Sequence, residues 1–415
     1  MNNNKYVITI SYDDYTQGTG GTDKVILSQQ MLLNNAGYDV VHISPYYNLR
    51  FWNLLIDGEF KGIYSNHRLK ALLYSKKMVK LCAIFIHHLK NIQIDLLDSI
   101  LDYCDVPIFY YLHDYYTICP KSGLIKEDGM FCGNGFPTAI KCRGCSYFDE
   151  SGKLVNKIRS FLKKYENRIT FIAPSESAKN VWIKDYPQYA DKIRVIYHQK
   201  LSGEYIGNRN LLCDEEPLKI GFVGYQKPLK GWKQFKEAVK NAQQLNLNET
   251  FYQFGWGEEK LTGVEQVDVD FKVSMTAMID ALRCRDIDIA VIWSTWPETY
   301  AYTYYEALAA NCFVLTNHLS GNVCCQIQSR RNGVVGEDLK ELLSDEKKLR
   351  ELINNFRTNG HQTPSELKEN EKFLNLITDF DGQLAKVRKQ LDISLLLSIV
   401  IKTKRKIGQH LKREG

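Results

Sequence analysis

Residues 296–317, WPETYAYTYYEALAANCFVLTN, combine two acidic side chains, a helical pattern and an apolar strand pattern in one run. Glu298 and Glu306 have seven residues between them. A proline and the Thr-Tyr-Ala-Tyr run predict a loop up to about Tyr302, with Thr303 as the N-cap of the helix that follows. Glu298 is then expected in the loop and Glu306 in the first helical turn, ahead of a strand.

This arrangement has two interpretations. Backbone N–H groups at the start of a helix attract anions such as a pyrophosphate. The carboxylates of Glu298 and Glu306 on either side are hydrogen-bond acceptors for sugar or ribose hydroxyls. Alternatively, both acids are solvated or only stabilise the helix start. The spacing by itself does not decide between a ligand site and this structural role.

Outward from this run, short apolar stretches alternate with longer helical patterns in both halves of the chain. Such alternation indicates parallel, doubly wound sheets and therefore an α/β fold. Strands are predicted at 218–223, 251–254, 287–292 and 312–316, with helices at 233–245, 276–283 and 303–310. In the first half, strands are predicted at 6–11, 39–43, 81–86, 107–112 and 170–173, with helices around 25–35 and 94–103.

An acidic, proline-containing link, CDEEP at 213–217, separates the two halves. We predict an N-terminal Rossmann-like domain at 1–205, a C-terminal Rossmann-like domain at 214–385 and a basic amphipathic tail at 386–415. Two open α/β domains that face each other place ligands at the carboxyl ends of their strands, in the cleft between them.

Composition narrows the functional classes. The chain has 415 residues, 44% of them hydrophobic, with 54 Lys+Arg against 48 Asp+Glu. These values exclude a disordered chain, and a net charge of +6 does not call for nucleic acid. The start carries no export signal, and the longest apolar run, 393–401, is too short to cross a bilayer. We therefore expect a cytoplasmic protein with reduced thiols.

The basic tail has two interpretations of its own. The run KTKRKIGQHLKR at 402–413 follows the apolar run 393–401. It is either an interfacial helix that draws the protein to the inner face of an anionic membrane, or a solvated terminal helix with ordinary charges.

Four cysteines, in the pattern C-x12-C-x9-C-x2-C, gather in a loop rich in glycine and charge. Four thiolates match a tetrahedral structural zinc site. Free loop thiols, redox-labile pairs and an iron–sulfur cluster are the alternatives. Zinc here would stiffen a loop and take no part in the chemistry. The four residues are Cys119, Cys132, Cys142 and Cys145.

The run 296–317 resembles the E-x7-E signature of the retaining glycosyltransferases of family 4, the group 1 transferases, which have the GT-B fold. Further matches follow in order along 5–385. GTGG at 18–21 and AGYDV at 36–40 resemble the first glycine loop and its helix. FVGYQKPLKG at 222–231 resembles the family's "VGR…KG" loop, and DIAVIWS at 288–294 the strand before the acidic motif. The cysteine-rich segment at about 115–150, after the pair His113-Asp114, is similar to an insert found in a subset of the family.

The resemblance implies that the domain at 1–205 binds the acceptor and that the domain at 214–385 binds the nucleotide sugar. It also implies roles for individual residues of the donor site. Glu306 would bind the nucleotide ribose and Glu298 the donor sugar hydroxyls. The backbone amides of Tyr300, Ala301 and Tyr302 would approach the sugar and the phosphates. Lys230 would neutralise the leaving diphosphate. The remaining donor-binding residues implied are Gly224 and Lys227, which share the loop with Lys230.

One position departs from the family pattern. Tyr225 stands where the family usually has an arginine, so one positive charge is missing there. Lys227 is the candidate replacement, but a flexible ammonium does not reproduce the forked guanidinium.

On the acceptor side, His113 and Asp114 follow a predicted strand in YYLHDYY, at a position where polar side chains face a cleft. In the family a histidine here lies near the reacting sugar, which implies that His113 positions groups or handles a proton. Gly20 and Gly21 would let the backbone approach donor and acceptor closely; the alternative for both is a simple tight turn.

The activity implied is transfer of a sugar from a nucleoside diphosphate to a glycan or lipid-linked glycan, with retention of configuration, in the biosynthesis of a capsule, O-antigen or similar surface polysaccharide. No catalytic metal is expected, because the sequence has no convincing DxD loop for a metal-bound diphosphate. Asp286 and Asp288 spell DID, but they lie at a predicted strand start, which indicates a structural role. Two alternatives remain: a non-catalytic nucleotide-sugar-binding partner of a transferase, and a sugar-nucleotide epimerase of the same fold.

Overall fold

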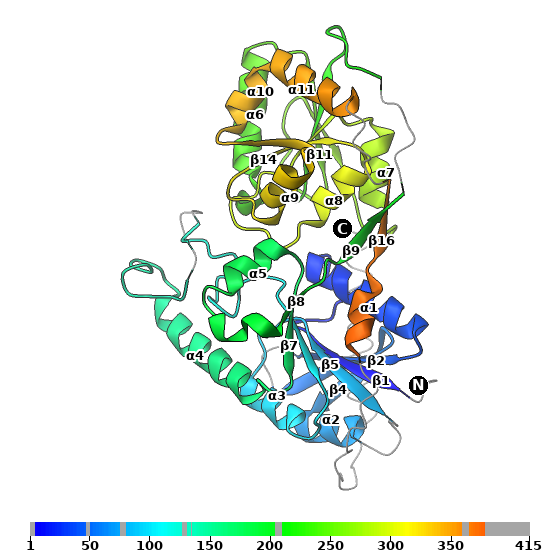
Figure 1. Cartoon of the computed structure of the whole chain (residues 1–415), viewed down its shortest axis with the longest axis vertical. Helices are drawn as coiled ribbons and strands as arrows, with labels where there is room; N and C mark the ends of the chain where they lie inside the picture. The colour runs from blue at the N-terminus through cyan, green and yellow to red at the C-terminus, as the bar shows by residue number, and fades with distance from the viewer. Residues whose placement is uncertain are drawn as a thin grey trace. The chain divides into compact units, whose positions relative to one another are not determined.

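The computed structural model describes residues 5–46, 50–74, 80–126, 131–133, 135–203, 210–358 and 365–377 (Figure 1). The predicted tail at 386–415 lies outside these residues. The chain divides into two compact units, each built from separate stretches of sequence. One unit comprises Met1–Tyr111, Asn156–Phe171 and Glu371–Gly415, and the other Leu112–Val155 and Ile172–Asn370. The predicted acceptor and donor domains, 1–205 and 214–385, stay a prediction.

The first sheet is mixed. Its strands follow the order β4-β3-β2-β1-β5-β6-β7-β8. β1 pairs in parallel with β2 and β5, whereas β3 is antiparallel to both β2 and β4. The strands are β1 (Tyr6–Ile10), β2 (Asp39–Pro45), β3 (Phe51–Ile56), β4 (Glu59–Ser65), β5 (Leu81–Ile86), β6 (Ile108–Tyr111), β7 (Ile169–Ala173) and β8 (Ile193–Val195).

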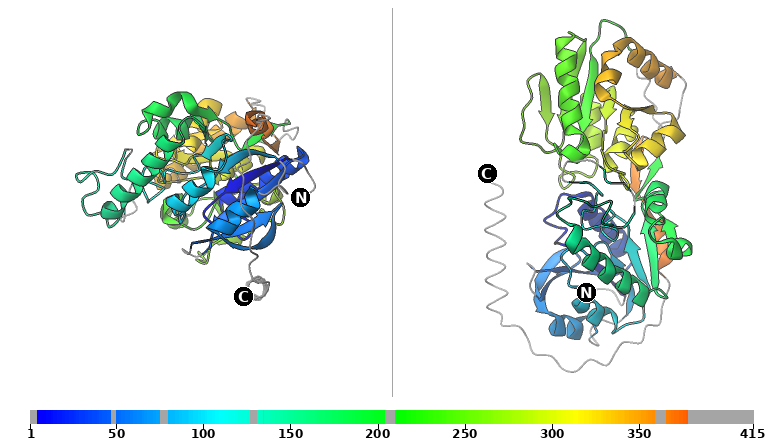
Figure 2. Two further views of the ribbon diagram at one scale, coloured as in Figure 1. Left: turned by 90° about the horizontal axis from the view of Figure 1, so that it is seen from below. Right: turned by 90° about the vertical axis from the view of Figure 1, so that its left-hand side faces the viewer.

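Six helical segments accompany this sheet, of which α4 is the longest. It is one continuous helix that can be followed in the three views of Figures 1 and 2. The segments are α1 (Gly21–Asn35), α2 (Asn66–Leu73), α3 (Ile94–Leu101), α4 (Phe148–Lys164), α5 (Glu176–Trp182) and the 3-10 helix η1 (Pro187–Lys192).

The second sheet is parallel throughout and has the order β12-β11-β10-β13-β14-β15. Its strands are β10 (Leu218–Val223), β11 (Glu249–Phe254), β12 (Val264–Val267), β13 (Ile289–Val291), β14 (Phe313–Asn317) and β15 (Gly333–Gly336). A separate antiparallel pair joins β9 (Gln199–Ser202) to β16 (Glu366–Glu369).

Helices cover both faces of the second sheet, because alternate residues of each strand point to opposite faces. Ile289 and Val291 pack in one apolar cluster with α6, α10 and α11, which Figure 1 shows together. Ala290 and Ile292 pack in the other cluster, with α7, α8 and α9. The helices are α6 (Trp232–Gln244), α7 (Ala277–Cys284), α8 (Tyr302–Ala309), α9 (Asn322–Arg330), α10 (Leu339–Ser344) and α11 (Glu346–Thr358), with the 3-10 helices η2 (Pro228–Lys230) and η3 (Glu371–Leu376).

The prediction of two doubly wound α/β halves is confirmed, and most predicted strands lie within two residues of their observed bounds. The antiparallel hairpin β3–β4 was missed. Its signal is the pair Asp57-Gly58, whose positive φ angles of 49° and 81° are those of a two-residue hairpin turn. Because this hairpin extends the edge of the first sheet, that sheet is mixed and not purely parallel.

Two further sequence expectations concern single residues and membrane spans. The Asp288 carboxylate accepts the backbone N–H of Lys219 at 2.9 Å and forms an ion pair with Arg357 of α11. Asp288 is therefore a structural residue, as its place at a predicted strand start indicated. Among the described residues, no helix has the length and apolar character that crossing a bilayer requires.

A buried acid at the start of β11 makes stability depend on pH. Neither carboxylate oxygen of Glu249 has a hydrogen-bond partner among the described residues. Burial, with a smaller contribution from the nearby Glu346, raises the pKa of Glu249 from 4.5 to about 8. The folded state therefore holds this proton more tightly than the unfolded state, and stability falls as the pH rises from about 4.5 to about 8.

We predict that Glu249→Gln stabilises the protein above pH 8 by up to ~5 kcal/mol, since each pKa unit is worth about 1.4 kcal/mol, and has little effect at pH 4. Chemical denaturation of the full chain at both pH values measures this difference. The control is Glu351→Gln, at an exposed position of α11. A gain in stability that is equal at both pH values would contradict the prediction.

Candidate functional site at the switch point of the second sheet

The order of the second sheet reverses between β10 and β13. The chain continues from β10 to β11 and β12 on one side, and from β13 to β14 and β15 on the other. In open parallel sheets, ligands bind at the carboxyl ends of the two strands where the order reverses. Here the two segments that leave this point are 224–231 after β10 and 292–301 after β13. They carry Lys230 and Glu298.

The structure brings Lys230 and Glu298 together as an ion pair, with side chains 31% and 6% exposed. The Ser294 hydroxyl donates to Glu298 Oε1 at 2.6 Å, and the Trp296 indole N–H donates to the same oxygen at 3.1 Å. Lys230 also contacts Oε1. Among the described residues, no hydrogen bond reaches Oε2 of Glu298. One oxygen therefore anchors the buried carboxylate and the other keeps its acceptor capacity for a ligand.

Two glycines allow the segments to meet at Glu298. Gly231 ends η2 with a φ of 85°, and a Cβ there would lie 2.3 Å from the Trp293 carbonyl oxygen. Gly321 precedes α9 with a φ of 58°, and a Cβ there would lie 2.6 Å from the Glu298 backbone nitrogen. Any side chain at either position would push the β13 segment away.

Segments far apart in sequence brace the loop at 297–301, all within the same compact unit. The Tyr115 hydroxyl donates to the Pro297 carbonyl at 3.0 Å. The Thr299 hydroxyl donates to the His113 carbonyl at 2.7 Å, and the Ser175 hydroxyl donates to the Thr299 carbonyl at 2.6 Å. The loop that follows β6 therefore contacts the acidic motif directly, and His113 lies beside that motif.

The start of α8 corrects the predicted cap. The helix begins at Tyr302, and its N-cap is Ala301 with a φ of 61°, so Thr303 is not the cap. Asn322 holds the preceding turn, because its side-chain amide donates to the Tyr300 carbonyl at 2.7 Å. This bond and the hydrogen bonds that brace the loop fix the direction in which the chain enters α8. Ala301 takes the left-handed conformation that this direction requires. Glu306 consequently lies just beyond the first turn, where it is buried.

Sequence reasoning missed a second histidine near His113. The ring centroids of His198 and His113 are 5.5 Å apart, and the His198 ring stacks on Tyr302 at 5.7 Å. Burial, and secondarily the neighbouring His113, hold the pKa of His198 well below its usual value. The position of His198 in the sequence could have indicated it. His198 is a polar residue just beyond strand β8, as His113 is just beyond strand β6.

The other predicted donor residues are divided between the two units. Gly224, with a φ of 143°, and Lys227 lie with Lys230 on the segment after β10. The Lys227 ammonium lies over the Tyr225 ring, 5.7 Å from its centroid. Gly20 and Gly21 belong to the other compact unit, where Gly20 precedes α1 and its N–H donates to Asp23 at 3.0 Å. Their part in donor or acceptor binding stays a prediction.

The four cysteines of the cysteine-rich segment form no disulfide. All eleven cysteines lie in the described ranges, and none forms a disulfide. Burial raises the pKa of the Cys119 thiol, and the neighbouring Cys132, Cys142 and Cys145 add to the rise. Within the part of the chain that the structure describes, no three His, Cys, Asp or Glu side chains are arranged to hold a metal ion. The structural zinc prediction therefore gains no support here.

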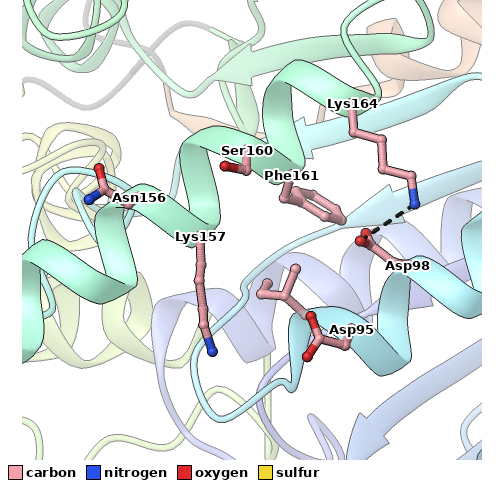
Figure 3. A pocket seen from close by; sticks show the side chains of 8 residues that line it. Asp95, Asp98, Asn156, Lys157, Ser160, Phe161 and Lys164 are labelled. Atoms are coloured by element: carbon pink, nitrogen blue, oxygen red, sulfur yellow. Dashed lines mark ion pairs between the residues drawn. The ribbon is translucent and has the colours of Figure 1, made fainter.

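A cavity of about 330 Å³ lies elsewhere, between α3 and α4 (Figure 3). Lys164 points toward Asp98 across it, with an N–O distance of 3.5 Å, and also pairs with Asp102 at 2.9 Å. Because these charges neutralise each other, the cavity presents no strong charge to a ligand, and it is not the candidate site. It is lined by Ile94, Asp95, Asp98, Asn156, Lys157, Ser160, Phe161 and Lys164.

No protein-family model matches the chain, and no curated protein does. Solved structures do match it. Sucrose-phosphate synthase from Thermosynechococcus elongatus is 12% identical with a TM-score of 0.56, over 86% of this chain and 94% of that one. Anabaena HepE in complex with UDP-glucose is 13% identical with a TM-score of 0.50, over 87% and 95%. A glycosyltransferase from Rickettsia africae is 14% identical with a TM-score of 0.50, over 88% and 95%.

At sequence identities of 12%, 13% and 14%, the structural similarity establishes the fold of the chain. The chain has the GT-B fold, an α/β architecture with two Rossmann-like domains, and the structures it matches include glycosyltransferases.

Ala301 provides a test of the loop geometry. We predict that Ala301→Gly stabilises the protein by ~1 kcal/mol, because glycine adopts a positive φ without the steric cost that alanine pays. The control, Ala281→Gly inside α7, is expected to destabilise by about 1 kcal/mol. Chemical denaturation measures both. Destabilisation of similar size by the two substitutions would contradict the assigned conformation of Ala301.

Proposed function

We propose that this chain is a retaining glycosyltransferase. It transfers a sugar from a nucleoside diphosphate to a glycan or lipid-linked glycan in the biosynthesis of a surface polysaccharide of the capsule, O-antigen or lipopolysaccharide type. The observation that carries the proposal is the meeting of Lys230 and Glu298 at the switch point of the second sheet. The resemblance to family 4 and the match to HepE, whose structure contains UDP-glucose, support the same activity.

In this proposal the ion pair is the resting state of the donor site. The diphosphate of the donor takes the place of Glu298 as the partner of the Lys230 ammonium. Fixed positive charge near the leaving diphosphate stabilises the transition state, which is usually a large catalytic contribution. The backbone amides at the start of α8, around Tyr300, Ala301 and Tyr302, add partial positive charge on the other side.

Glu298 binds the donor sugar. Ser294, Trp296 and Lys230 all contact Oε1, so Oε2 is the oxygen that accepts sugar hydroxyls. When Lys230 turns to the diphosphate, the Ser294 and Trp296 bonds still hold the carboxylate in place. Glu306, buried in α8, binds the ribose hydroxyls in the proposal.

The remaining assignments complete the proposal. His113 positions the reacting groups or handles the acceptor proton, and Gly20 and Gly21 admit donor and acceptor to the backbone. Lys227 supplies charge beside Tyr225, where the family usually has arginine. The protein works in the cytoplasm, with the tail at 386–415 meeting the inner face of the membrane.

We predict that Lys230→Ala and Glu298→Gln each lower turnover by about 100-fold or more, because each removes a group that contacts the reacting donor. Release of nucleoside diphosphate by the full chain, with a panel of nucleotide sugars and glycan acceptors, measures this. The matched control is Lys233→Ala, an exposed lysine of α6 that is expected to leave turnover unchanged.

The same assay separates the rival functions. Donor binding without release of nucleoside diphosphate under any acceptor would favour a non-catalytic binding partner. Conversion of the donor without an acceptor would favour an epimerase. The anomeric configuration of the product, read by NMR, tests retention.

We keep a structural zinc ion at the four cysteines as part of the proposal, supported by their residue type and spacing. Elemental analysis of gently purified protein is expected to find about one zinc per chain, which Cys142→Ser/Cys145→Ser removes. The control is Cys213→Ser/Cys284→Ser, at two exposed thiols. Protein without zinc would overturn the assignment, and iron in its place would favour a cluster.

A further inference from the structure

The segments that follow β10 and β11 run side by side beyond the ends of these strands. The last paired residues are Val223 and Phe254. Past them, the Gly224 N–H donates to the Phe254 carbonyl at 2.9 Å, and the Gln226 N–H donates to the Trp256 carbonyl at 3.3 Å. Trp256 therefore lies at the same sheet edge as the donor-site segment that carries Lys230.

Two hydrogen bonds from the Gln226 side-chain amide hold the segment that carries Trp256. The Gln226 side chain donates to the Glu259 carbonyl at 2.8 Å and accepts the Glu259 N–H at 2.8 Å. It also passes over Gly257, where a Cβ would lie 1.9 Å from its Cδ. The indole of Trp232, in α6, donates to the Glu259 carboxylate at 2.7 Å. The segment that carries Trp256 is thus tied both to the loop after β10 and to α6.

Although its backbone is held in this way, the Trp256 side chain is 59% exposed. An exposed tryptophan on a braced loop presents a flat apolar ring on which a planar ligand can stack. Tyr225, with the Lys227 ammonium over its ring, occupies the equivalent place after β10, two residues past the last paired residue. The edge of β10 and β11 therefore presents aromatic rings and a cation beside Lys230.

We propose that Trp256 is the stacking surface for the nucleobase of the nucleoside diphosphate donor, with Tyr225 and Lys227 next to it. This rests on the proposed function, because it uses the same donor site. An aromatic ring can stack on the flat face of any nucleobase, and a nearby cation adds to the attraction.

The order of the strands in the sheet favours the base, and not the sugar, as the part of the donor that binds at Trp256. Neighbouring strands lie ~4.8 Å apart, so the end of β11 is one strand spacing from the end of β10, which leads to Lys230, and two from the end of β13, which leads to Glu298. A diphosphate held by Lys230 has the sugar at one end and the nucleoside at the other. Since Oε2 of Glu298 takes the sugar on the β13 side, the nucleoside extends over β11, toward Trp256.

Calorimetric titration of the full chain with UDP, ADP, GDP and UDP-glucose, and with inorganic pyrophosphate, tests this. Trp256→Ala is expected to weaken binding of the preferred nucleoside diphosphate about ten-fold or more, and Trp256→Phe to keep most of it. Pyrophosphate, which has no base, is expected to bind the wild type and Trp256→Ala equally. The control is Leu245→Ala, which removes a side chain of similar exposure, 53%, at the far end of α6.

Each other outcome overturns the inference in a recognisable way. Unchanged nucleotide binding by Trp256→Ala removes the base from Trp256 but leaves the proposed function standing. Equal weakening of nucleotide and pyrophosphate shows that the substitution disturbs the phosphate site instead. Weakening of UDP-glucose without weakening of UDP places the sugar on Trp256. Wild-type protein that binds none of these ligands overturns the proposed function and this inference together.

Discussion

The buried carboxylate of Glu298 is the constraint on which the rest of the proposed donor site depends. Placing an ionised group in a site where its side chain is 6% exposed costs free energy unless donors surround it. Ser294, Trp296 and Lys230 supply three donors, and they come from two different segments of chain. The loop after β10 must therefore meet the loop after β13, and the switch point of the sheet becomes a charged site.

The same constraint explains the bracing of the loop that carries this carboxylate. A loop that ends in a helix with a left-handed cap is costly to order, and its backbone groups need partners. Tyr115, Ser175 and Asn322 bond to its carbonyls, and the Thr299 hydroxyl bonds to the His113 carbonyl. Helix α8 consequently starts in a fixed direction, with its first N–H groups beside the acidic residue.

The loop after β10 carries its positive charge differently from the pattern it resembles. With Tyr225 in place of arginine, the positive charge of this segment rests on Lys227 and Lys230. The two ammonium groups have different surroundings. Each lies over an aromatic ring, Lys227 over Tyr225 and Lys230 over Trp296, but only Lys230 also pairs with the buried acid. A flexible ammonium carries charge without the geometric demand of a guanidinium, so tight binding here depends on how neighbouring rings and loops are held.

The sequence by itself determined the alternation of strands and helices and the position of Glu298 ahead of α8, whereas the structure showed that the loop of Lys230 meets the loop of Glu298 at the switch point. Local periodicity and turn residues encode the first two features, although the Asp57-Gly58 hairpin shows that such a signal can be overlooked. Only the tertiary structure decided that Ala301 caps α8 and that His198 lies against His113. These depend on contacts between residues far apart in the chain, which periodicity cannot encode, because each local segment has several conformations and packing selects one.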